Sequence, residues 1–162
     1  MKLLVLAIGH RQPAWADAAW EEFAKRFPPE FPLALQALKA EPRQGAKTAA
    51  QAMAAEGVRI EAALARERRL GPGARRIVLD ERCTRLTTVQ LADRLRSWRA
   101  EGRDAVFVIG GPDGLDVAVR ERADETWRLS DLTLPHALAR VLLAEALYRA
   151  HTLIEGHPYH RA

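Results

Sequence analysis

The sequence predicts one α/β domain in which helices cover both faces of a parallel sheet. Short apolar segments alternate with longer helical segments along the whole chain, which is typical of three-layer α/β proteins. The length of 162 residues suits a single domain, and no repeat or low-complexity linker divides it. Residues 105–109 form an unbroken apolar run, as expected of a parallel strand buried on both faces. We therefore expect one domain over residues 1–162.

Five segments have the composition of strands. The first follows Met1 and has the basic residue and apolar run of a signal peptide. The run is only six residues long, however, and no cleavage site of small residues follows it. We therefore interpret it as a buried strand. The expected strands are residues 2–8, 33–38, 76–80, 105–109 and 127–130.

Four helices are expected between and after these strands. Trp20, Phe23 and Phe27 lie near helical spacing in the first, which a proline-rich segment ends. Threonine caps and one apolar face indicate the third. The expected helices are residues 15–27, 46–68, 87–99 and 136–154, with polar loops at 41–45 and 81–86 and a tail at 155–162.

The composition excludes several classes of protein. The single cysteine, Cys83, excludes an internal disulfide and fits a reducing compartment. No cysteine and histidine cluster has the spacing of a metal site, and no apolar segment reaches the length of a membrane span. We therefore expect a cytoplasmic protein without a metal or a membrane partner. The net charge of +4 permits an anionic partner such as RNA but does not require one.

The last expected helix is apolar around most of its circumference, which points to assembly. A helix of this kind is normally buried on all sides. A C-terminal helix packed on a sheet face, however, leaves its outer side uncovered. We expect a second subunit to cover that side in a homodimer, and the alternative is deep burial within one subunit.

Two of the expected strands lead into loops with the character of a ligand site. Gly110, Gly111 and Gly114 follow the strand at 105–109, and glycines let a ligand approach the backbone amides. The loop at 131–136 follows the strand at 127–130. Ligands of open α/β sheets bind beyond the carboxyl ends of the strands, so we expect both loops at one site. An enzyme with a phosphate-bearing cofactor is disfavoured, because the chain has neither a GxGxxG pattern after the first strand nor a Walker lysine.

Several motifs, taken in order, resemble those of one family of RNA methyltransferases. They are residues 1–9, 56–57, 79–80, 102–104, 109–114, 132–136, 140–142, 145, 147–150 and 157–161. Together they resemble the SPOUT class and, within it, the ribosomal RNA large subunit methyltransferase H family, whose members methylate N3 of a pseudouridine in 23S rRNA. The resemblance covers the whole chain, and its most specific parts are the glycine-rich loop, the loop before the last helix and the closing tail.

The resemblance implies the SPOUT methyltransferase fold, in which a parallel three-layer sheet carries a C-terminal trefoil knot. Such knots are rare exceptions to un-knotted topology. It also implies S-adenosyl-L-methionine as cofactor. Carried over residue by residue, the cofactor-binding residues are Leu79, Gly110, Leu129, Ser130, Asp131, Leu132, Thr133 and Leu134. Without the resemblance, Leu79 and Leu132 would be interpreted as core residues and Asp131 as a surface residue.

The proton acceptor is not identified by the sequence. Candidates for substrate binding or catalysis are His136, Arg140, Arg149, His157, Tyr159 and His160. The alternative for His136 is a local cap or hydrogen bond. Both arginines are candidates for rRNA phosphate contacts, although Glu145 lies at helical pairing distance from Arg149. The resemblance implies that the tail becomes ordered near an active site, its own or the partner subunit's, whereas a short terminus is otherwise disordered.

One segment departs from the family pattern. A Gly-Lys pair usually follows the Leu-Asp motif, whereas residues 81–85 of this chain are Glu-Arg-Cys-Thr-Arg. The glycine is missing, so the shape of this loop and its substrate contacts are in doubt. We expect an S-adenosylmethionine-dependent methyltransferase that acts as a homodimer on 23S rRNA in the ribosome. The alternative is a non-catalytic RNA- or ribosome-binding module with the same fold.

Overall fold

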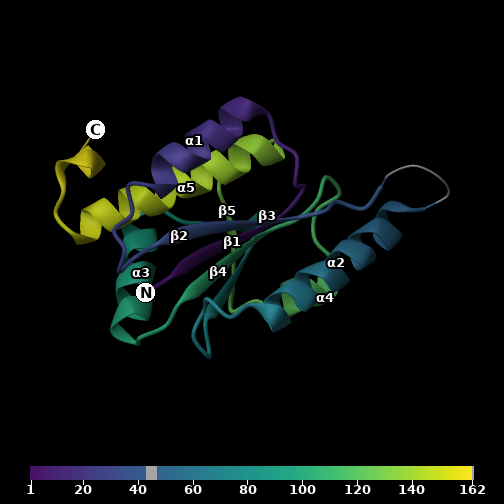
Figure 1. Ribbon diagram of the computed structural model, residues 1–162, viewed down its shortest axis with the longest axis horizontal. Helices are drawn as coiled ribbons and strands as arrows, with labels where there is room; N and C mark the ends of the chain where they lie inside the picture. The colour runs from purple at the N-terminus through teal and green to yellow at the C-terminus, as the bar shows by residue number, and fades with distance from the viewer. Residues whose placement is uncertain (43–46, 162) are drawn as a thin grey trace.

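The chain forms one parallel sheet of five strands (Figure 1). The computed structural model describes residues 1–42 and 47–161, apart from the side chains of residues 160 and 161. The strand order is β2-β1-β4-β3-β5. The strands are β1 (Leu3–Ile8), β2 (Leu33–Leu38), β3 (Arg75–Arg85), β4 (Ala105–Ile109) and β5 (Glu125–Arg128).

Helices cover both faces of this sheet, which confirms the predicted three-layer α/β class. The helices are α1 (Ala14–Ala24), α2 (Ala49–Arg66), α3 (Thr88–Ala100), α4 (Val117–Glu121), α5 (His136–Ile154) and the 3-10 helix η1 (Pro158–Arg161). The helices α1, α3 and α5 pack in one hydrophobic layer, and α2 and α4 pack in the other. Figure 1 shows α1 and α5 together above the sheet, with α2 and α4 below it.

The two layers share their strands, which explains the unbroken apolar runs. In β1, Leu3 and Val5 face the layer of α5, whereas Leu4 and Leu6 face the layer of α2. Every residue of β1 and of β4 is buried. A strand buried on both faces gains from apolar side chains at consecutive positions, so the usual alternation with polar residues disappears.

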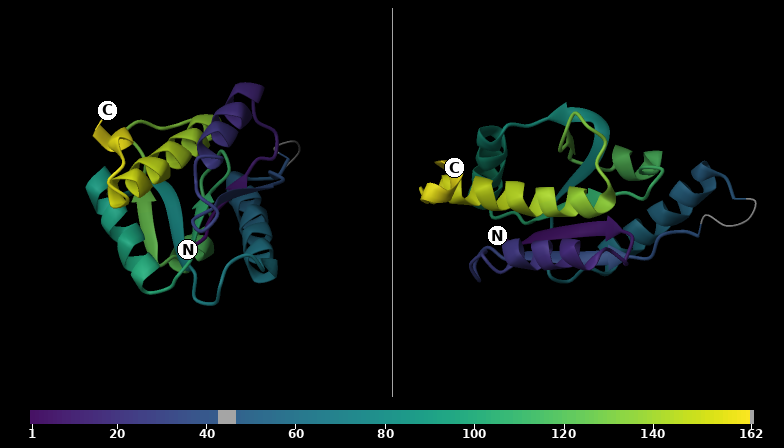
Figure 2. Two further views of the ribbon diagram at one scale, coloured as in Figure 1. Left: turned by 60° about the vertical axis from the view of Figure 1, so that its left-hand side comes forward. Right: turned by 90° about the horizontal axis from the view of Figure 1, so that it is seen from above.

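The helix α5 lies between α1 and α3 and leaves one side uncovered. Leu143 and Leu147 point into the core, whereas Leu138 and Leu142 are 40% and 41% exposed. Figure 2 shows α5 crossing the sheet toward the C-terminal tail, which lies at the end of the helix. The uncovered side is the one that we expect a second subunit to cover, and the homodimer remains a prediction.

The observed boundaries differ from the predicted ones mainly at helix ends. Thr48 and Thr87 cap α2 and α3, and each forms a capping box with a glutamine three residues later. The predicted start of the second helix, residue 46, lies outside the described residues. The helix α1 ends at Ala24, three residues early, because the backbone then tightens into a turn before the prolines.

Two predictions about the elements were wrong, and one element was missed. The segment predicted as a polar loop at 81–86 belongs largely to β3, which continues to Arg85. The strand β5 spans 125–128, two residues earlier than the predicted 127–130. The helix α4 was not predicted, because its five residues are too few to show a helical period. The C-terminal trefoil knot remains a prediction that rests on the resemblance.

Candidate functional site

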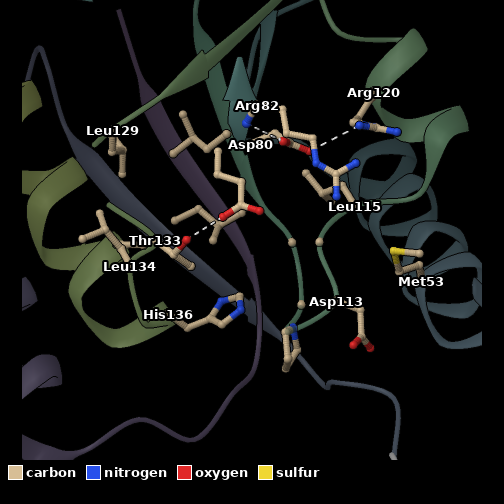
Figure 3. Close-up of a pocket in the computed structure, with 18 of the residues that line it drawn as sticks. Met53, Asp80, Arg82, Asp113, Leu115, Arg120, Leu129, Thr133, Leu134 and His136 are labelled. Atoms are coloured by element: carbon tan, nitrogen blue, oxygen red, sulfur yellow. Dashed lines mark hydrogen bonds and ion pairs between the residues drawn. The ribbon is translucent and has the colours of Figure 1, made fainter. Parts of the chain in front are cut away.

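A pocket of about 450 Å³ lies beyond the carboxyl ends of β4 and β5 and beside the middle of β3. Its walls come from the middle of β3, the glycine-rich loop after β4, the loop between β5 and α5, and two residues of α2 (Figure 3). Its size is that of a site for a small molecule or cofactor. The prediction that two strand-end loops meet at one site is therefore confirmed.

The glycine-rich loop, residues 110–114, forms the wall between β4 and α4. The Gly114 amide donates a hydrogen bond to the Gly111 carbonyl at 2.9 Å, which closes a tight turn. Gly114 has a φ of 95°, a conformation that favours glycine. A Cβ on Gly110 would lie 2.6 Å from the Gly114 carbonyl oxygen and 2.6 Å from Leu115 Cγ. Glycine at 110 is therefore required by the loop's own fold and not only by the approach of a ligand.

The middle of β3 bulges toward the pocket. Leu79 and Thr84 both align with Trp127 of β5, so residues 80–83 are extra residues within the ladder. The bulge brings Asp80 and Arg82 into the pocket wall, and Asp80 accepts hydrogen bonds from the Arg82 amide at 2.9 Å and from Arg120 at 3.4 Å (Figure 3). This is the segment that departs from the family pattern, and it supplies a charged wall.

The loop between β5 and α5 forms the opposite wall. The Thr133 hydroxyl donates a hydrogen bond to the Glu81 carboxylate at 2.8 Å, which joins this loop to the bulge (Figure 3). The Ser130 hydroxyl accepts a hydrogen bond from the Leu132 amide at 2.9 Å. The Leu132 side chain is 76% exposed. An apolar side chain so poorly covered in a pocket wall is available to a ligand or to a partner.

Nearly all of the predicted cofactor residues come together in this pocket. Those that line it are Leu79, Gly110, Leu129, Ser130, Leu132, Thr133 and Leu134. Asp131 does not line it, because its carboxylate pairs with Arg85 at 2.8 Å and with Arg128 at 2.9 Å. The interpretation of Asp131 as a surface residue fits this geometry, since the side chain is exposed.

Among the six substrate or catalytic candidates, His136 lies in the pocket wall. It is the first residue of α5. Burial lowers the pKa of His136 below its ordinary value of 6.5, and this outweighs the opposing effect of a hydrogen bond to the backbone of Gly111. The ring is therefore uncharged at neutral pH. Its Nδ1 is buried and has no hydrogen-bond partner among the described residues.

Arg140 is buried one turn further along α5. Its Nη2 donates hydrogen bonds to the carbonyl of Ile8, at 2.9 Å, and to the carbonyl of Gly9. Backbone carbonyls left without partners at the end of a buried strand are costly, and the guanidinium satisfies two of them. The structure thus gives Arg140 a role in joining β1 to α5, and it places no phosphate-accessible guanidinium at this position.

The remaining candidates lie at the other end of α5. Arg149 is roughly 20 Å along the helix from His136, at 1.5 Å per residue. It pairs with Glu145 at 2.7 Å, as the spacing allowed. The Tyr159 hydroxyl donates to the same carboxylate at 3.3 Å, and its ring meets Tyr148 with centroids 4.9 Å apart. The chain's own pocket therefore does not contain its tail.

Two further tail candidates complete this group. His157 is exposed, and its Nδ1 accepts a hydrogen bond from the Tyr159 amide at 3.2 Å. The side chain of His160 lies outside the described residues. The tail packs on α5 of the same chain through Tyr159, and its place near an active site remains a prediction.

Sequence reasoning missed several pocket residues. Met53 lines the pocket from α2, and Arg120 lines it from α4. The available signal for α4 was Asp116, whose carboxylate accepts a hydrogen bond from the Ala118 amide at 2.9 Å and caps the helix. Nothing in the sequence signals that α2 reaches the same site, because α2 comes from a distant part of the chain.

Two absences can be stated for the described part of the chain. Within residues 1–42 and 47–161, no three histidine, cysteine, aspartate or glutamate side chains gather as metal ligands would. The helices in those ranges also include none that is long and apolar enough to span a bilayer.

Comparisons with known proteins agree with this geometry. A family model described as "Predicted SPOUT methyltransferase" matches residues 1–160. The protein named "Ribosomal RNA large subunit methyltransferase H" from Leptothrix cholodnii is 60% identical over 161 residues, which are 99% of each chain. The protein of that name from Bordetella petrii is 55% identical over 100% of each chain.

One solved structure supports the fold alone. It is described as that of a probable methylase family protein from Haemophilus influenzae, and it aligns with a TM-score of 0.53 and 13% identity. The alignment covers 98% of this chain and 69% of that one. From the family match and the full-length relatives, the chain belongs to the SPOUT methyltransferases and, within them, to the ribosomal RNA large subunit methyltransferase H family.

Proposed function

We propose that this protein methylates N3 of a pseudouridine in 23S rRNA on the assembled ribosome, with S-adenosyl-L-methionine as the methyl donor. The observation that carries the proposal is the pocket, because all the residues expected to bind the cofactor line it except Asp131. The relatives that share the chain's full length are named for rRNA methylation. Ribosomes are in the cytoplasm, and we place the protein there with them.

The residues present fit such a cofactor. Leu79, Leu132 and Leu134 provide apolar surface for an adenine ring, and the glycine-rich loop exposes backbone groups near it. The Glu81 carboxylate is exposed in the same wall and can accept hydrogen bonds from hydroxyl groups. The cofactor supplies an electrophilic methyl group on a sulfonium. Placing the base in line with that carbon is the main task of the pocket.

His136 is our candidate for the proton acceptor. The methyl group would pass to N3 as its bond to the sulfonium sulfur breaks and a neutral thioether leaves, and the proton on N3 has to be taken up by a base. An imidazole that is uncharged at neutral pH can take this proton, because its free ring nitrogen is an acceptor. His136 is placed for this role because its ring lies in the pocket wall, and burial, which lowers its pKa, keeps the ring in the uncharged form that can accept a proton.

A homodimer would complete the site. The tail lies far from the pocket of its own subunit, whereas the uncovered leucines of α5, Leu138 and Leu142, lie on the half of the helix that begins at the pocket. Antiparallel pairing of two α5 helices through this surface would bring the tail of each subunit near the pocket of the other. His157 and Tyr159 would then stack on or hydrogen-bond the substrate nucleotide.

The test combines two measurements. Mass spectrometry of rRNA nucleosides from a strain that lacks the gene should show the loss of one methylated pseudouridine, which the wild-type gene restores. Calorimetry should show that the purified protein binds S-adenosylmethionine. If the protein is instead the non-catalytic module, it should bind ribosomes but not the cofactor. The rRNA of the deletion strain should then carry the same methylated nucleosides as the rRNA of the wild type.

A further inference from the structure

A buried carboxylate outside the pocket wall contacts the loop that forms that wall. Glu56 is in the middle of α2 and is 2% exposed. Buried carboxylates are rare, because removing the charge from water is costly unless other groups satisfy it. The proposed reaction gives Glu56 no task, and its place in the molecule therefore needs a separate explanation.

One contact of Glu56 is with Glu41, three residues after the end of β2. Its Oε1 accepts a hydrogen bond from the Glu41 amide at 2.9 Å. Glu41 is buried too, and its carboxylate pairs with Lys47 and Arg59. The Glu56 carboxylate thus contacts the backbone of a residue whose own side chain is held by two ion pairs.

The other contact is with the glycine-rich loop. A Cβ built on Gly111 would lie 2.2 Å from Glu56 Oε2 and 2.9 Å from its Cδ. Real Cβ atoms do not approach other atoms so closely, so the carboxylate occupies the space that any side chain at 111 would need. Gly111 forms the turn with Gly114, and both line the pocket. The carboxylate therefore lies directly against the turn that forms this wall, and it does not itself line the pocket.

Gly57, the residue after Glu56, lies against the segment that follows the glycine-rich loop. A Cβ on Gly57 would lie 3.1 Å from Asp116 Cβ and 3.3 Å from Val119 Cγ2. Glycine in a helix interior costs stability relative to alanine. Here it allows α2 to approach α4 and the loop closely. Glu56 and Gly57 together set the position of α2 against both ends of the segment 111–119.

We propose that Glu56 is a positioning residue of the methyltransferase: its buried carboxylate holds the glycine-rich loop, through Gly111, in the shape that receives the cofactor. The inference rests on the proposed function only for the identity of the ligand. The position of the loop itself can be measured without any ligand, so the two proposals can fail separately.

The first experiment measures the loop directly. In Glu56→Ala, hydrogen exchange at the Gly114 amide should accelerate by roughly tenfold or more, because its bond to Gly111 opens more often. Glu56→Gln keeps the size of the side chain and the acceptor oxygen for the Glu41 amide, and should retain most of the protection. Unchanged exchange in Glu56→Ala would overturn the proposal, whether or not the protein binds S-adenosylmethionine.

The second experiment tests the contact by a double-mutant cycle on cofactor affinity. Gly111→Ala should weaken S-adenosylmethionine binding by about tenfold or more in the wild-type background, and by much less when Glu56 is already alanine, because the clash is gone. The matched control is Gly110→Ala, which clashes with Gly114 and Leu115 and not with Glu56. Its effect should be the same in both backgrounds.

The outcomes separate the two proposals. If Gly111→Ala and Gly110→Ala respond equally to the loss of Glu56, the positioning role is wrong. If Glu56→Ala only lowers the urea midpoint while affinity and loop exchange stay at wild-type values, the carboxylate is structural and the proposal is also wrong. If the wild-type protein fails to bind S-adenosylmethionine, the proposed function fails, and the exchange experiment alone decides the role of Glu56.

Discussion

His151 shows how one buried side chain links stability to pH. Its ring stacks on Phe31, with centroids 4.8 Å apart, and on Phe27 at 5.8 Å. Burial lowers the pKa of His151 below 6.5. The folded protein thus holds the ring uncharged, whereas the unfolded chain takes up a proton near 6.5.

We expect stability to fall on the acid side because of this residue. The contribution of His151 is complete above pH 6.5 and is lost as the pH falls toward the lowered folded pKa. His136 acts in the same direction. In His151→Phe, the urea midpoint should therefore change less between pH 7.5 and pH 5.5 than in the wild type. His10→Ala, an exposed histidine, serves as control, and an equal pH response of both variants would contradict the expectation.

A larger side chain at Gly110 should abolish cofactor binding. The added Cβ would overlap the Gly114 carbonyl and Leu115, so the loop would have to leave its observed shape. For Gly110→Val we expect S-adenosylmethionine affinity to fall by at least a hundredfold, as for overlap with backbone atoms that cannot move aside. Calorimetry measures the affinity, and circular dichroism checks that the fold is retained. Wild-type affinity in this variant would place the cofactor elsewhere.

The sequence predicted the residues that line the pocket better than the residues that pack behind its walls. Leu79, Leu132 and Leu134 belong to motifs that resemble those of a known family, so they could be named in advance. Glu56 belongs to such a motif too, yet its contact with Gly111 joins segments 55 residues apart, and only the folded chain shows it. Arg140 was expected at phosphates, because a sequence shows the charge of a side chain and not its burial.

Among the elements, α5 makes the clearest prediction. If the exposed leucines of α5 pair with those of a second subunit, the protein is a dimer. It should then sediment at micromolar concentration with about twice the 18.1 kDa mass of the chain. Leu142→Arg should shift it toward the monomer, because a charge in an apolar interface is costly. Val58→Arg alters an apolar residue on α2 that is more exposed than Leu142, and it should leave the dimer intact. A wild-type monomer would contradict the proposed shared site.

The tail makes the second prediction at this scale. Removal of residues 157–162 deletes the contacts of Tyr159 with Tyr148 and Glu145, which should cost about 1 kcal/mol of stability. Cofactor binding should stay close to that of the wild type, because the pocket of the same chain is distant. Methylation of ribosomes from the deletion strain should collapse, if the tail serves the partner's site. Full-rate methylation by the truncated protein would remove the tail from the site.

The bulge in β3 and the short helix α4 could not be predicted from the sequence. Residues 80–85 are polar, and polarity in a short segment indicates a loop when the neighbouring strand is unknown. The pairing of Thr84 and Arg85 with β5 depends on a strand that forms more than 40 residues later. Such partners are set by the tertiary fold and not by local composition.

For the molecule as a whole, the class of fold was predictable and the order of its strands was not. Alternating strands and helices require parallel crossovers, which leads to a sheet with helices on both faces. The order β2-β1-β4-β3-β5 places β4 between β1 and β3, out of chain order. Apolar periodicity carries no information on this order, because each strand would be equally well buried at several positions of the sheet.

The bulge in β3 also makes part of the pocket exchangeable. The strand leaves Trp127 at Leu79 and returns to the same residue at Thr84, so the four residues between them lie outside the ladder. Residues 80–83 are therefore free of the alternation and the fixed register that restrict a paired strand. Their side chains can therefore be replaced as a unit while the sheet keeps its pairing. Residues 80–83 are therefore the part of the wall at which the ligand preference of this pocket can be changed, whereas the glycine-rich loop has to keep its sequence.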